Sequence, residues 1–338
     1  MNTSSDGTHN PLVAGSNPAG PTNHAASADS AHSHRRIKQP LSNIQRSGLT
    51  RRRFLSGLTA LAVAHRAAAN GWAILDDYVN GNVYDIGAAL QVGPVQLLNR
   101  EYDCLPVRLR DQDVIEGINS QSILNFEADE PAFAPLDESR QTILCTLRDF
   151  DVMCARRGGA SQHAFWMPSC SRWRLVNLAI IGFGGIGVCI YGQRTLAGGK
   201  DPSDATFNRL TDCRIGTCLH GIVLTGTRGE PRIKGGTANC NHVETTTVSS
   251  CRGHGVWINQ GGLNELDHVI GGNHGGDMFR IAWYSNTLVA PGAERTGGWG
   301  IFFTGNAETR ANRVLGYHDG GANGKRGIGG KLKGQVIL

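Results

Sequence analysis

The chain reads Asn264-Glu265-Leu266, then Asn286-Thr287-Leu288, then Asn312-Arg313-Val314. Each of these steps pairs an asparagine with an apolar residue two positions later. The same step occurs upstream at Asn177, Asn208 and Asn241, so that successive asparagines are 31, 33, 23, 22 and 26 residues apart. A period of this length is typical of a solenoid, in which each repeat forms one rung of a continuous stack.

Short apolar segments, most of them opened by glycine, follow these asparagines and predict strands. They read Gly221-Ile222-Val223-Leu224, Gly255-Val256-Trp257-Ile258, Phe279-Arg280-Ile281-Ala282 and Gly300-Ile301-Phe302-Phe303. The chain of 338 residues contains 46 glycines, whereas aromatic residues make up 7% and charged residues 18%. Abundant glycine without a three-residue period indicates many tight turns between short strands.

The positive charge of the chain is concentrated at its N-terminal end. Residues 1–69 hold eight Lys/Arg and two Asp, which gives +6, while the remainder holds 25 basic and 26 acidic residues, which gives −1. The total of +5 therefore gives no reason to expect nucleic-acid binding by the repeats.

Two N-terminal segments precede the repeats. Residues 1–46 are rich in Ser, Asn, Ala and Pro and predict a disordered leader, and we expect the natural start to lie near Leu49. Within residues 47–69, Thr50-Arg51-Arg52-Arg53-Phe54-Leu55 and the apolar run after it resemble a twin-arginine export signal. A basic helix on a membrane surface is the alternative. We expect residues 70–338 to be exported to the periplasm or the cell exterior, with no transmembrane anchor.

The order of segments after residue 84 resembles the opening of the pectate-lyase-like right-handed parallel β-helix superfamily. A predicted capping helix at 84–91 is followed by Leu105-Pro106-Val107, by Ile115-Glu116-Gly117 and by Ser122-Ile123-Leu124. Asn99-Arg100 stands where the superfamily pattern has glycine. The resemblance spans about 84–320 and implies an all-β, right-handed, single-stranded parallel β-helix with polysaccharide as its substrate class. Leucine-rich repeats are the competing solenoid, but their Leu-x-x-Leu-x-Leu pattern does not precede the asparagines.

Stacked rungs turn the repeat into columns of side chains. The position two residues after each asparagine is apolar throughout and should point into the core: Ala179, Leu210, Val243, Leu266, Leu288 and Val314. We interpret the asparagines as a structural ladder, because a short amide tolerates left-handed turns and can bond to the neighbouring rung. Cys218 and Cys251 fall at equivalent positions, so a disulfide or a stack of thiols is expected there.

Positions that flank the core column should point outward and bring His242, Glu244, Glu265 and Asp267 into one patch. Glu244 and Asp267 would be neighbours, at about the 5–5.5 Å separation that retaining glycosidases use. Such a pair could supply an acid and a base, or its oxygens could bind Ca²⁺. The alternative is an ordinary solvated sheet face. Cysteine and histidine spacing elsewhere predicts no metal site.

Trp257, Arg280 and Phe302 form a second predicted column, each one residue past the first apolar position of a strand. Exposed aromatic rings stack on sugars and arginine pairs with sugar carboxylates, so we predict substrate binding here. The alternative is that these side chains pack under a loop.

Three shorter motifs are weaker candidates for a functional site than the patch around Glu244 and Asp267. Gly253-His254-Gly255 and Arg232-Ile233-Lys234 resemble polygalacturonase motifs but occur in the reverse order, so we interpret them as a turn and part of a long loop. Asp149-Phe150-Asp151 places two carboxylates on one predicted strand face without a partner His or Arg.

The function expected from these features is that of an exported polysaccharide lyase or glycoside hydrolase. Its partners would be a polysaccharide and, during export, the twin-arginine translocation machinery. The main alternative is a non-catalytic surface or adhesion protein that binds glycans along a flat face. A truncated pseudogene product is a third interpretation.

Overall fold

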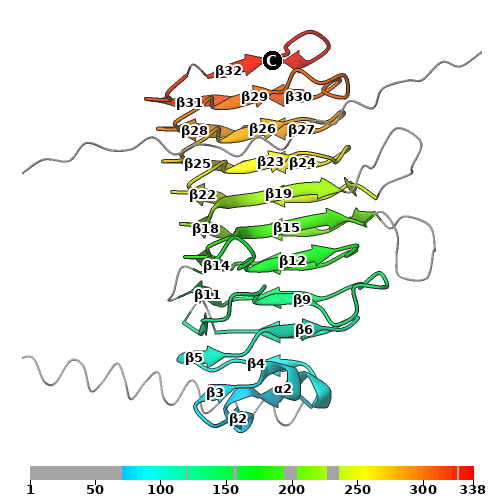
Figure 1. Ribbon diagram of the computed structural model, residues 1–338, viewed down its shortest axis with the longest axis vertical. Coiled ribbons are helices and arrows are strands. Elements are labelled where there is room, and N and C mark those ends of the chain that lie inside the picture. Colours follow the sequence, from blue (N-terminus) through cyan, green and yellow to red (C-terminus); the bar gives the residue numbers. More distant parts are fainter. Residues whose placement is uncertain (1–70, 119–120, 155–157, 194–203, 227–235, 326) are drawn as a thin grey trace, which may run out of the picture. The chain divides into compact units, whose positions relative to one another are not determined.

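The computed structural model describes residues 71–118, 121–154, 158–193, 204–226, 236–325 and 327–338, all within one compact unit. These residues form a right-handed, single-stranded parallel β-helix, as predicted, whose rungs are stacked in the order of the sequence (Figure 1). The predicted leader, the export signal and Arg232-Ile233-Lys234 lie outside the described residues. Within the described ranges, no helix has the length and apolar character needed to cross a membrane.

Three sheets form the sides of the solenoid. Sheet A contains β1 (Ala73–Ile74), β4 (Val95–Gln96), β7 (Val114–Glu116), β10 (Thr146–Arg148), β13 (Arg174–Val176), β17 (Arg209–Thr211), β21 (His242–Glu244), β24 (Glu265–Asp267), β27 (Thr287–Val289), β30 (Arg313–Leu315) and β33 (Val336–Ile337). Sheet B contains β2 (Val79–Asn80), β3 (Val83–Tyr84), β5 (Glu101–Cys104), β8 (Ile123–Phe126), β11 (Asp151–Cys154), β14 (Ala179–Ile181), β18 (Arg214–Gly216), β22 (Thr247–Ser249), β25 (Ile270–Gly272), β28 (Gly292–Glu294) and β31 (His318–Gly321).

Sheet C contains β6 (Val107–Leu109), β9 (Phe133–Pro135), β12 (Phe165–Pro168), β15 (Ile186–Gly192), β19 (His220–Gly226), β23 (Val256–Ile258), β26 (Phe279–Ile281), β29 (Ile301–Phe303) and β32 (Ile328–Gly330). A short pair, β16 (Ala205–Thr206) and β20 (Ala238–Asn239), lies beside the stack, and a 3₁₀ turn, η1 (Leu75–Asp77), lies near its start. The predicted capping helix is α2 (Ile86–Val92), and the Asp85 carboxylate caps it by accepting the Ala88 N–H at 2.8 Å.

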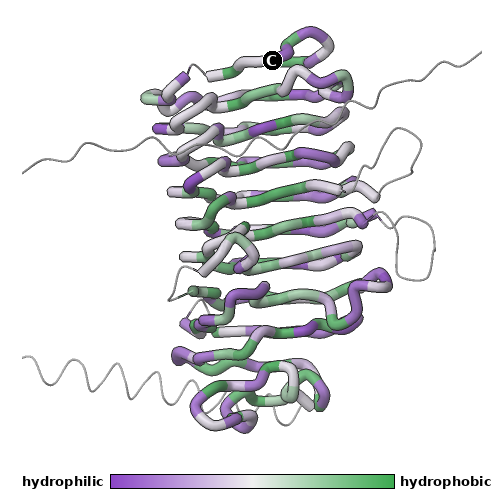
Figure 2. Tube along the Cα trace, in the orientation of Figure 1, coloured by the Kyte–Doolittle hydropathy of each residue, from purple (hydrophilic) through white to green (hydrophobic). Residues whose placement is uncertain are grey.

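Each rung bends at residues in the left-handed conformation, which non-glycine residues rarely adopt. In the rung of β24 these are Leu263 before sheet A, His268 between sheets A and B, and Asn273 after sheet B, with φ of 57°, 51° and 59°. Between the bends, apolar and polar residues alternate so that one face of each strand fills the interior (Figure 2). The predicted core column is confirmed for five of its six residues, which are buried and in register on sheet A: Leu210, Val243, Leu266, Leu288 and Val314. Ala179 is buried too but lies on sheet B, and Leu175 takes its place in the column.

The asparagine ladder is confirmed with two corrections. Asn208, Asn241, Asn264, Asn286 and Asn312 are buried, and each accepts the backbone N–H of the preceding ladder position, as Asn264 Oδ1 does from Asn241 at 2.9 Å. The asparagines themselves were predicted to adopt the left-handed conformation, but the residue before each asparagine adopts it instead. Asn177 does not belong to the ladder, because it lies at the bend after β13 and Trp173 occupies the ladder position of that rung.

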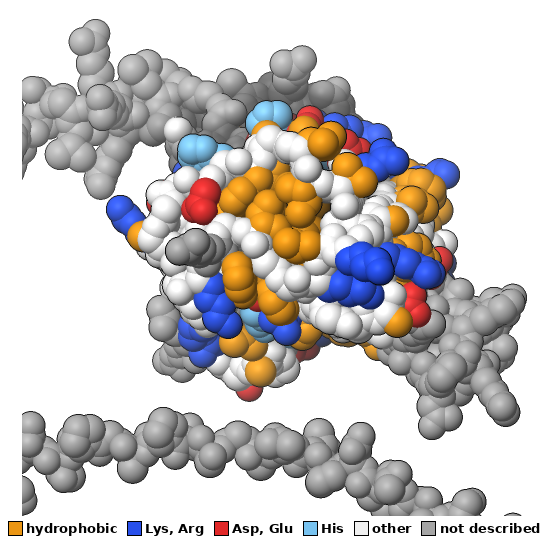
Figure 3. Space-filling view, turned by 90° about the horizontal axis from the view of Figure 1, so that it is seen from above, with side chains coloured by type: hydrophobic (Ala, Val, Ile, Leu, Met, Phe, Trp, Pro, Cys, Tyr) orange, Lys and Arg blue, Asp and Glu red, His pale blue; other side chains and the backbone are white. Residues whose placement is uncertain are grey.

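All nine cysteines are free thiols, and burial raises the pKa of Cys218 and Cys251 to about 11 and about 12. The stacked-thiol alternative therefore holds for this pair rather than the disulfide. At the C-terminal end of the stack, apolar side chains gather on the end face (Figure 3). The exposed apolar residues of the last strand and its surroundings are Leu332, Val336, Ile337 and Leu338.

Candidate functional site

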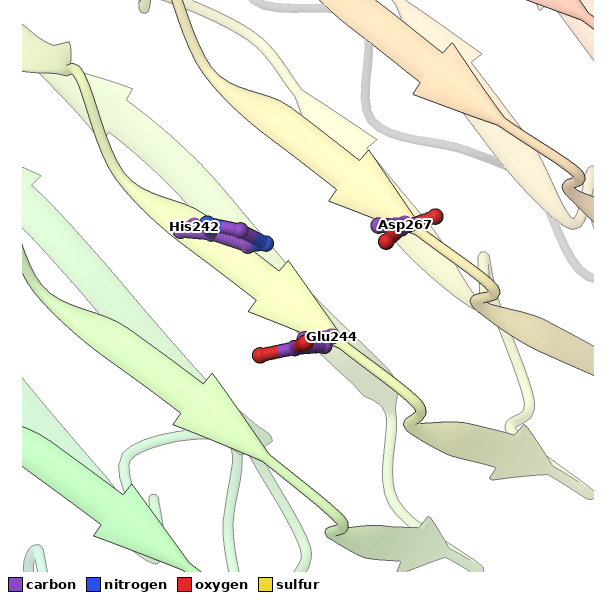
Figure 4. A group of neighbouring side chains, drawn as sticks. All are labelled: His242, Glu244 and Asp267. Atoms are coloured by element: carbon purple, nitrogen blue, oxygen red, sulfur yellow. The ribbon is translucent and has the colours of Figure 1, made fainter.

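The predicted patch lies on the outer face of sheet A. His242 and Glu244 flank buried Val243 on β21, so both side chains point away from the core. In the next rung, β24 pairs in register, with His242 opposite Glu265 and Glu244 opposite Asp267. His242, Glu244 and Asp267 lie together (Figure 4), and each has one atom able to bind a metal ion within 4.8 Å of such an atom in each of the other two residues. Glu265 is exposed at the margin of this group.

Hydrogen bonds and ion pairs give the two carboxylates of the patch different surroundings. Arg209, from β17 in the preceding rung, pairs with Glu244 at 2.5 Å. Asp267 lies 2.7 Å from Nδ1 of the exposed His268 at the adjacent bend. His242 Nε2 is buried and has no hydrogen-bond partner among the described residues. A buried polar atom without a partner calls for a physical explanation, and an ion at this place would supply one.

The donor set of the patch bears on the choice of cation. Ca²⁺ prefers six to eight oxygen ligands, roughly, and rarely takes imidazole. Two carboxylates and one imidazole match Zn²⁺ or Mn²⁺ better. His242, Glu244 and Asp267 are the residues that could hold such an ion, and water or a bound ligand would complete its coordination.

The second predicted column lies on sheet C. Trp257, Arg280 and Phe302 are in register on β23, β26 and β29, and the Arg280 guanidinium lies 5.2 Å from the centre of the Phe302 ring. All three side chains are partly exposed. The patch and this column therefore occupy different sheets, joined within each rung by the bend that contains the ladder asparagine.

Further rings extend the column in both directions, and sequence reasoning missed them. Trp166 precedes it in the same register and stacks on Tyr191 at 5.1 Å. Trp299 stacks on Phe302 at 6.2 Å. The alternation in Phe165-Trp166-Met167 was the signal that could have revealed Trp166, because its neighbours on both sides are buried.

A row of histidines beside sheet C was also missed. His220 and His254 stack at 5.4 Å and flank Trp257 at 5.4 and 5.8 Å. Burial lowers the pKa of both imidazoles, that of His220 to about 4. In the next rung, Asp277 lies 3.6 Å from His254 Nδ1 and 3.1 Å from Arg280.

The turn assignment of Gly253-His254-Gly255 is confirmed, and both glycines have a packing reason. A Cβ on Gly253 would lie 2.3 Å from His220 Cε1, and one on Gly255 would lie 2.6 Å from Met278 Sδ. These glycines therefore make room for side chains of neighbouring rungs. His254 itself is more than a turn residue, since it contacts both Trp257 and Asp277.

The Asp149-Phe150-Asp151 prediction is wrong in one respect. Asp149 has a φ of 65° and lies at the bend before β11, so the two carboxylates do not share a strand. Asp149 accepts a hydrogen bond from Asn177 at 2.8 Å, while burial raises the pKa of Asp151.

A groove of about 400 Å³ crosses the outer face of sheet B. The groove is lined in part by glycines, namely Gly271, Gly272 and Gly292. Thr247 and Ile270 also line it. Thr247 and Ile270 each follow a patch carboxylate by three residues, so the groove adjoins the patch around the bend between sheets A and B.

Comparison with known proteins gives similarity in structure only. No protein-family model matches the chain, and no curated protein matches it. Among solved structures, the chain is similar to the N-terminal fragment of gene product 12 of bacteriophage phi29, with 11% identity and a TM-score of 0.44 over 80% of this chain and 62% of that one. It is also similar to the ORF18 protein of Geobacillus virus E2, with 10% identity and a TM-score of 0.41 over 66% of this chain and 57% of that one.

A third similar structure is the A-module of a mannuronan C-5 epimerase from Azotobacter vinelandii, with 9% identity and a TM-score of 0.34 over 78% of this chain and 97% of that one. The chain spans about three fifths of the length of the two viral structures. At these identities the likeness concerns the fold, so function has to be argued from the side chains.

Proposed function

We propose that the chain is an exported protein that acts on an acidic polysaccharide at the sheet A patch, with a divalent cation held by His242, Glu244 and Asp267. The observation that carries this proposal is the in-register placement of Glu244 and Asp267 on neighbouring rungs, with His242 within 4.8 Å of both. Export is supported by Thr50-Arg51-Arg52-Arg53-Phe54-Leu55, and the substrate class by the resemblance of residues 84–320 to pectate-lyase-like proteins.

The proposed chemistry follows from the charges of the patch. A cation at this place would neutralise a sugar carboxylate and polarise it as a Lewis acid. The Arg209 guanidinium lies 2.5 Å from Glu244 and adds a second positive group beside the proposed cation. Glu265, at the exposed margin, would face sugar residues that extend beyond the patch.

A screen of acidic and neutral glycans, with and without chelator, tests this function. We expect wild-type protein to degrade at least one acidic glycan, chelator to abolish the activity, and Asp267→Asn and Glu244→Gln to lower it about 100-fold or more while circular dichroism stays unchanged. Thr287→Ala, one rung further along sheet A, is the matched control and should keep full activity. Chelator-resistant degradation, or full activity in both carboxylate variants, would refute the assignment.

A non-catalytic glycan-binding protein is the second candidate, supported by the exposed Trp257–Arg280–Phe302 column. The two functions separate in the same screen. If wild type degrades no glycan, yet binds one with an affinity that Trp257→Ala weakens and Asp267→Asn does not, the binding function is favoured.

A further inference from the structure

One row of side chains runs along the start of sheet C, at the first residue of a strand or in the turn before it. The register of that sheet places His163, Ile186, His220, His254, Asp277 and Trp299 at equivalent positions of successive rungs. The three histidines of the row make the same hydrogen bond with the following rung. His163 Nδ1 accepts the N–H of Ile186, His220 Nδ1 that of His254, and His254 Nδ1 that of Asp277, each at 2.9 Å.

This hydrogen bond fixes where each imidazole carries its proton. A backbone N–H can only donate, so the Nδ1 atom that accepts it has no proton, and the neutral ring must carry its hydrogen on Nε2. Burial, which lowers the pKa of all three histidines, also favours the neutral form. The rings of the row are therefore hydrogen-bond donors at Nε2.

His220 and His254 differ from His163 because they lie next to each other in successive rungs, whereas His163 is followed by Ile186. Their rings lie 5.4 Å apart at an interplanar angle of 16°, and 19% of the His254 side chain is exposed. Neither Nε2 atom has a hydrogen-bond partner among the described residues. Neither atom is fully buried, so both can be reached from solvent. Two parallel N–H donors thus remain open to a ligand.

The surroundings of the pair favour an anion. Besides burial, the positive charges of Arg252 and Arg280 help to lower the pKa of His220 and His254, respectively, whereas the Asp277 carboxylate raises that of His254; each ring therefore has a guanidinium group nearby. Trp257 lies against both imidazoles and gives the site an apolar wall. The nearest carboxylate, Asp277, is buried and bound to Arg280 at 3.1 Å and to the Trp299 N–H at 2.8 Å, so its charge is already compensated.

We propose that His220 and His254 form an oxyanion-binding pair, in which their two Nε2–H groups donate to a carboxylate, sulfate or phosphate group of a ligand that packs on Trp257. The pair acts as neutral donors and not as metal ligands, because metal binding at Nε2 would require the proton to move to Nδ1, where the next rung already donates. The site lies on sheet C and is independent of the proposed chemistry on sheet A.

Imidazole nitrogen spectroscopy of the isotope-labelled full chain tests the proposal directly. Sodium sulfate, sodium phosphate and sodium galacturonate are titrated separately, against sodium chloride at equal ionic strength. We expect the Nε2–H tautomer for both rings, and a saturable shift of the two Nε2–H resonances together with at least one of the three anions. The anion that binds most tightly identifies the source of the oxyanion.

Matched variants separate the pair from the scaffold role of the row. In His254→Asn and His220→Asn the amide oxygen can still accept the backbone N–H of the next rung, just as Asn264 accepts that of the preceding rung, but the ring donor is lost. We expect each to weaken anion binding at least tenfold. His163→Asn is the control, because His163 makes the same bond and stacks on Trp166 at 5.4 Å, yet has Ile186 instead of a histidine in the next rung.

Several results would overturn the proposal. They are a proton on Nδ1 of either ring, Zn²⁺ bound at Nε2, the absence of a saturable shift with all three anions, or an equal loss of affinity in His163→Asn. The tautomer and the titration are measured on wild-type protein, so the proposal remains testable even if a variant fails to fold.

Discussion

Asn264 shows how a single side chain joins neighbouring rungs. Its Oδ1 accepts both the backbone N–H and the Nδ2 of Asn241, while its own Nδ2 donates to the Ala238 carbonyl and to Asn286. All of these groups are buried, so each lost partner leaves a polar atom without solvent to replace it. The histidine row beside sheet C uses the same principle, with imidazole in place of amide.

Replacing Asn264 with leucine should therefore be costly, although leucine has the same number of side-chain heavy atoms with the same branching. We expect a loss of about 1–3 kcal/mol for each of the two groups of Asn241 left unpaired. Urea unfolding followed by circular dichroism measures the loss, and amide hydrogen exchange should show faster opening of β21 and β24. Glu265→Ala, at the exposed neighbouring position, is the control and should stay within about 0.5 kcal/mol of wild type. Equal effects in the two variants would contradict the ladder interpretation.

The sheet A patch could be predicted from the sequence, whereas the histidine pair could not. Glu244 and Asp267 follow ladder asparagines by three residues each, and side chains alternate strictly along a strand, so counting is sufficient. His220 and His254 are separated by 34 residues, His254 and Asp277 by 23, because loops of different length intervene. Their alignment depends on the sheet C register and on which backbone N–H each ring accepts, and neither is encoded in a local pattern.

Strands of this chain were easier to predict than the bends between them. The strands at 221–224, 255–258, 279–282 and 300–303 are present as β19, β23, β26 and β29, and the capping helix begins two residues later than predicted. The bends were missed because their left-handed positions are filled by unrelated residues such as Leu263, His268 and Ala290. Asparagine occurs both in the ladder and at a bend, which explains why Asn177 was assigned to the wrong position.

Glycine inside a strand of this solenoid marks close approach of backbone. A Cβ on Gly271, in the middle of β25, would lie 1.8 Å from the Val248 carbonyl oxygen, which cannot move without disturbing β22. We expect Gly271→Ala to destabilise the chain by about 1–3 kcal/mol through overpacking. Gly305→Ala, where nothing lies within 4 Å of the added Cβ, should leave the melting temperature nearly unchanged. Similar melting temperatures for the two variants would mean that β25 can shift more freely than its register implies.

The core of the solenoid is continuous along the stack, so the histidines packed in different rungs together determine how acid affects its stability. Histidines whose pKa is lowered by full or partial burial are present in several rungs, so acid should destabilise many rungs at once and not one local region. In repeat proteins each rung is stabilised chiefly by its neighbours, and loss of one interface therefore weakens the next. Acid sensitivity is consequently a property of the stack, although a single histidine can be used to measure it.

His274 is the clearest contributor to this acid sensitivity. It is 3% exposed, and burial lowers its pKa from 6.5 to about 4. Between these pH values the unfolded chain binds a proton that the folded chain does not, so the full stability is present above pH 6.5 and is lost as the pH falls toward 4. At about 1.4 kcal/mol per pKa unit, this histidine alone accounts for roughly 3 kcal/mol.

The expected result is a melting temperature that falls steadily between pH 7 and pH 4.5, measured by calorimetry at constant ionic strength. In His274→Asn the amide can accept the Cys251 N–H that His274 Nδ1 accepts at 3.2 Å, much as Asn323 accepts that of Thr296, but nothing titrates there. The variant should therefore lose less stability over the same interval, even if it is less stable at pH 7. Asp113 and Asp151, whose pKa values burial raises, oppose the histidines near the acid end, so the slope should flatten there. An unchanged pH slope in the variant would show that His274 is not the group that senses the acid.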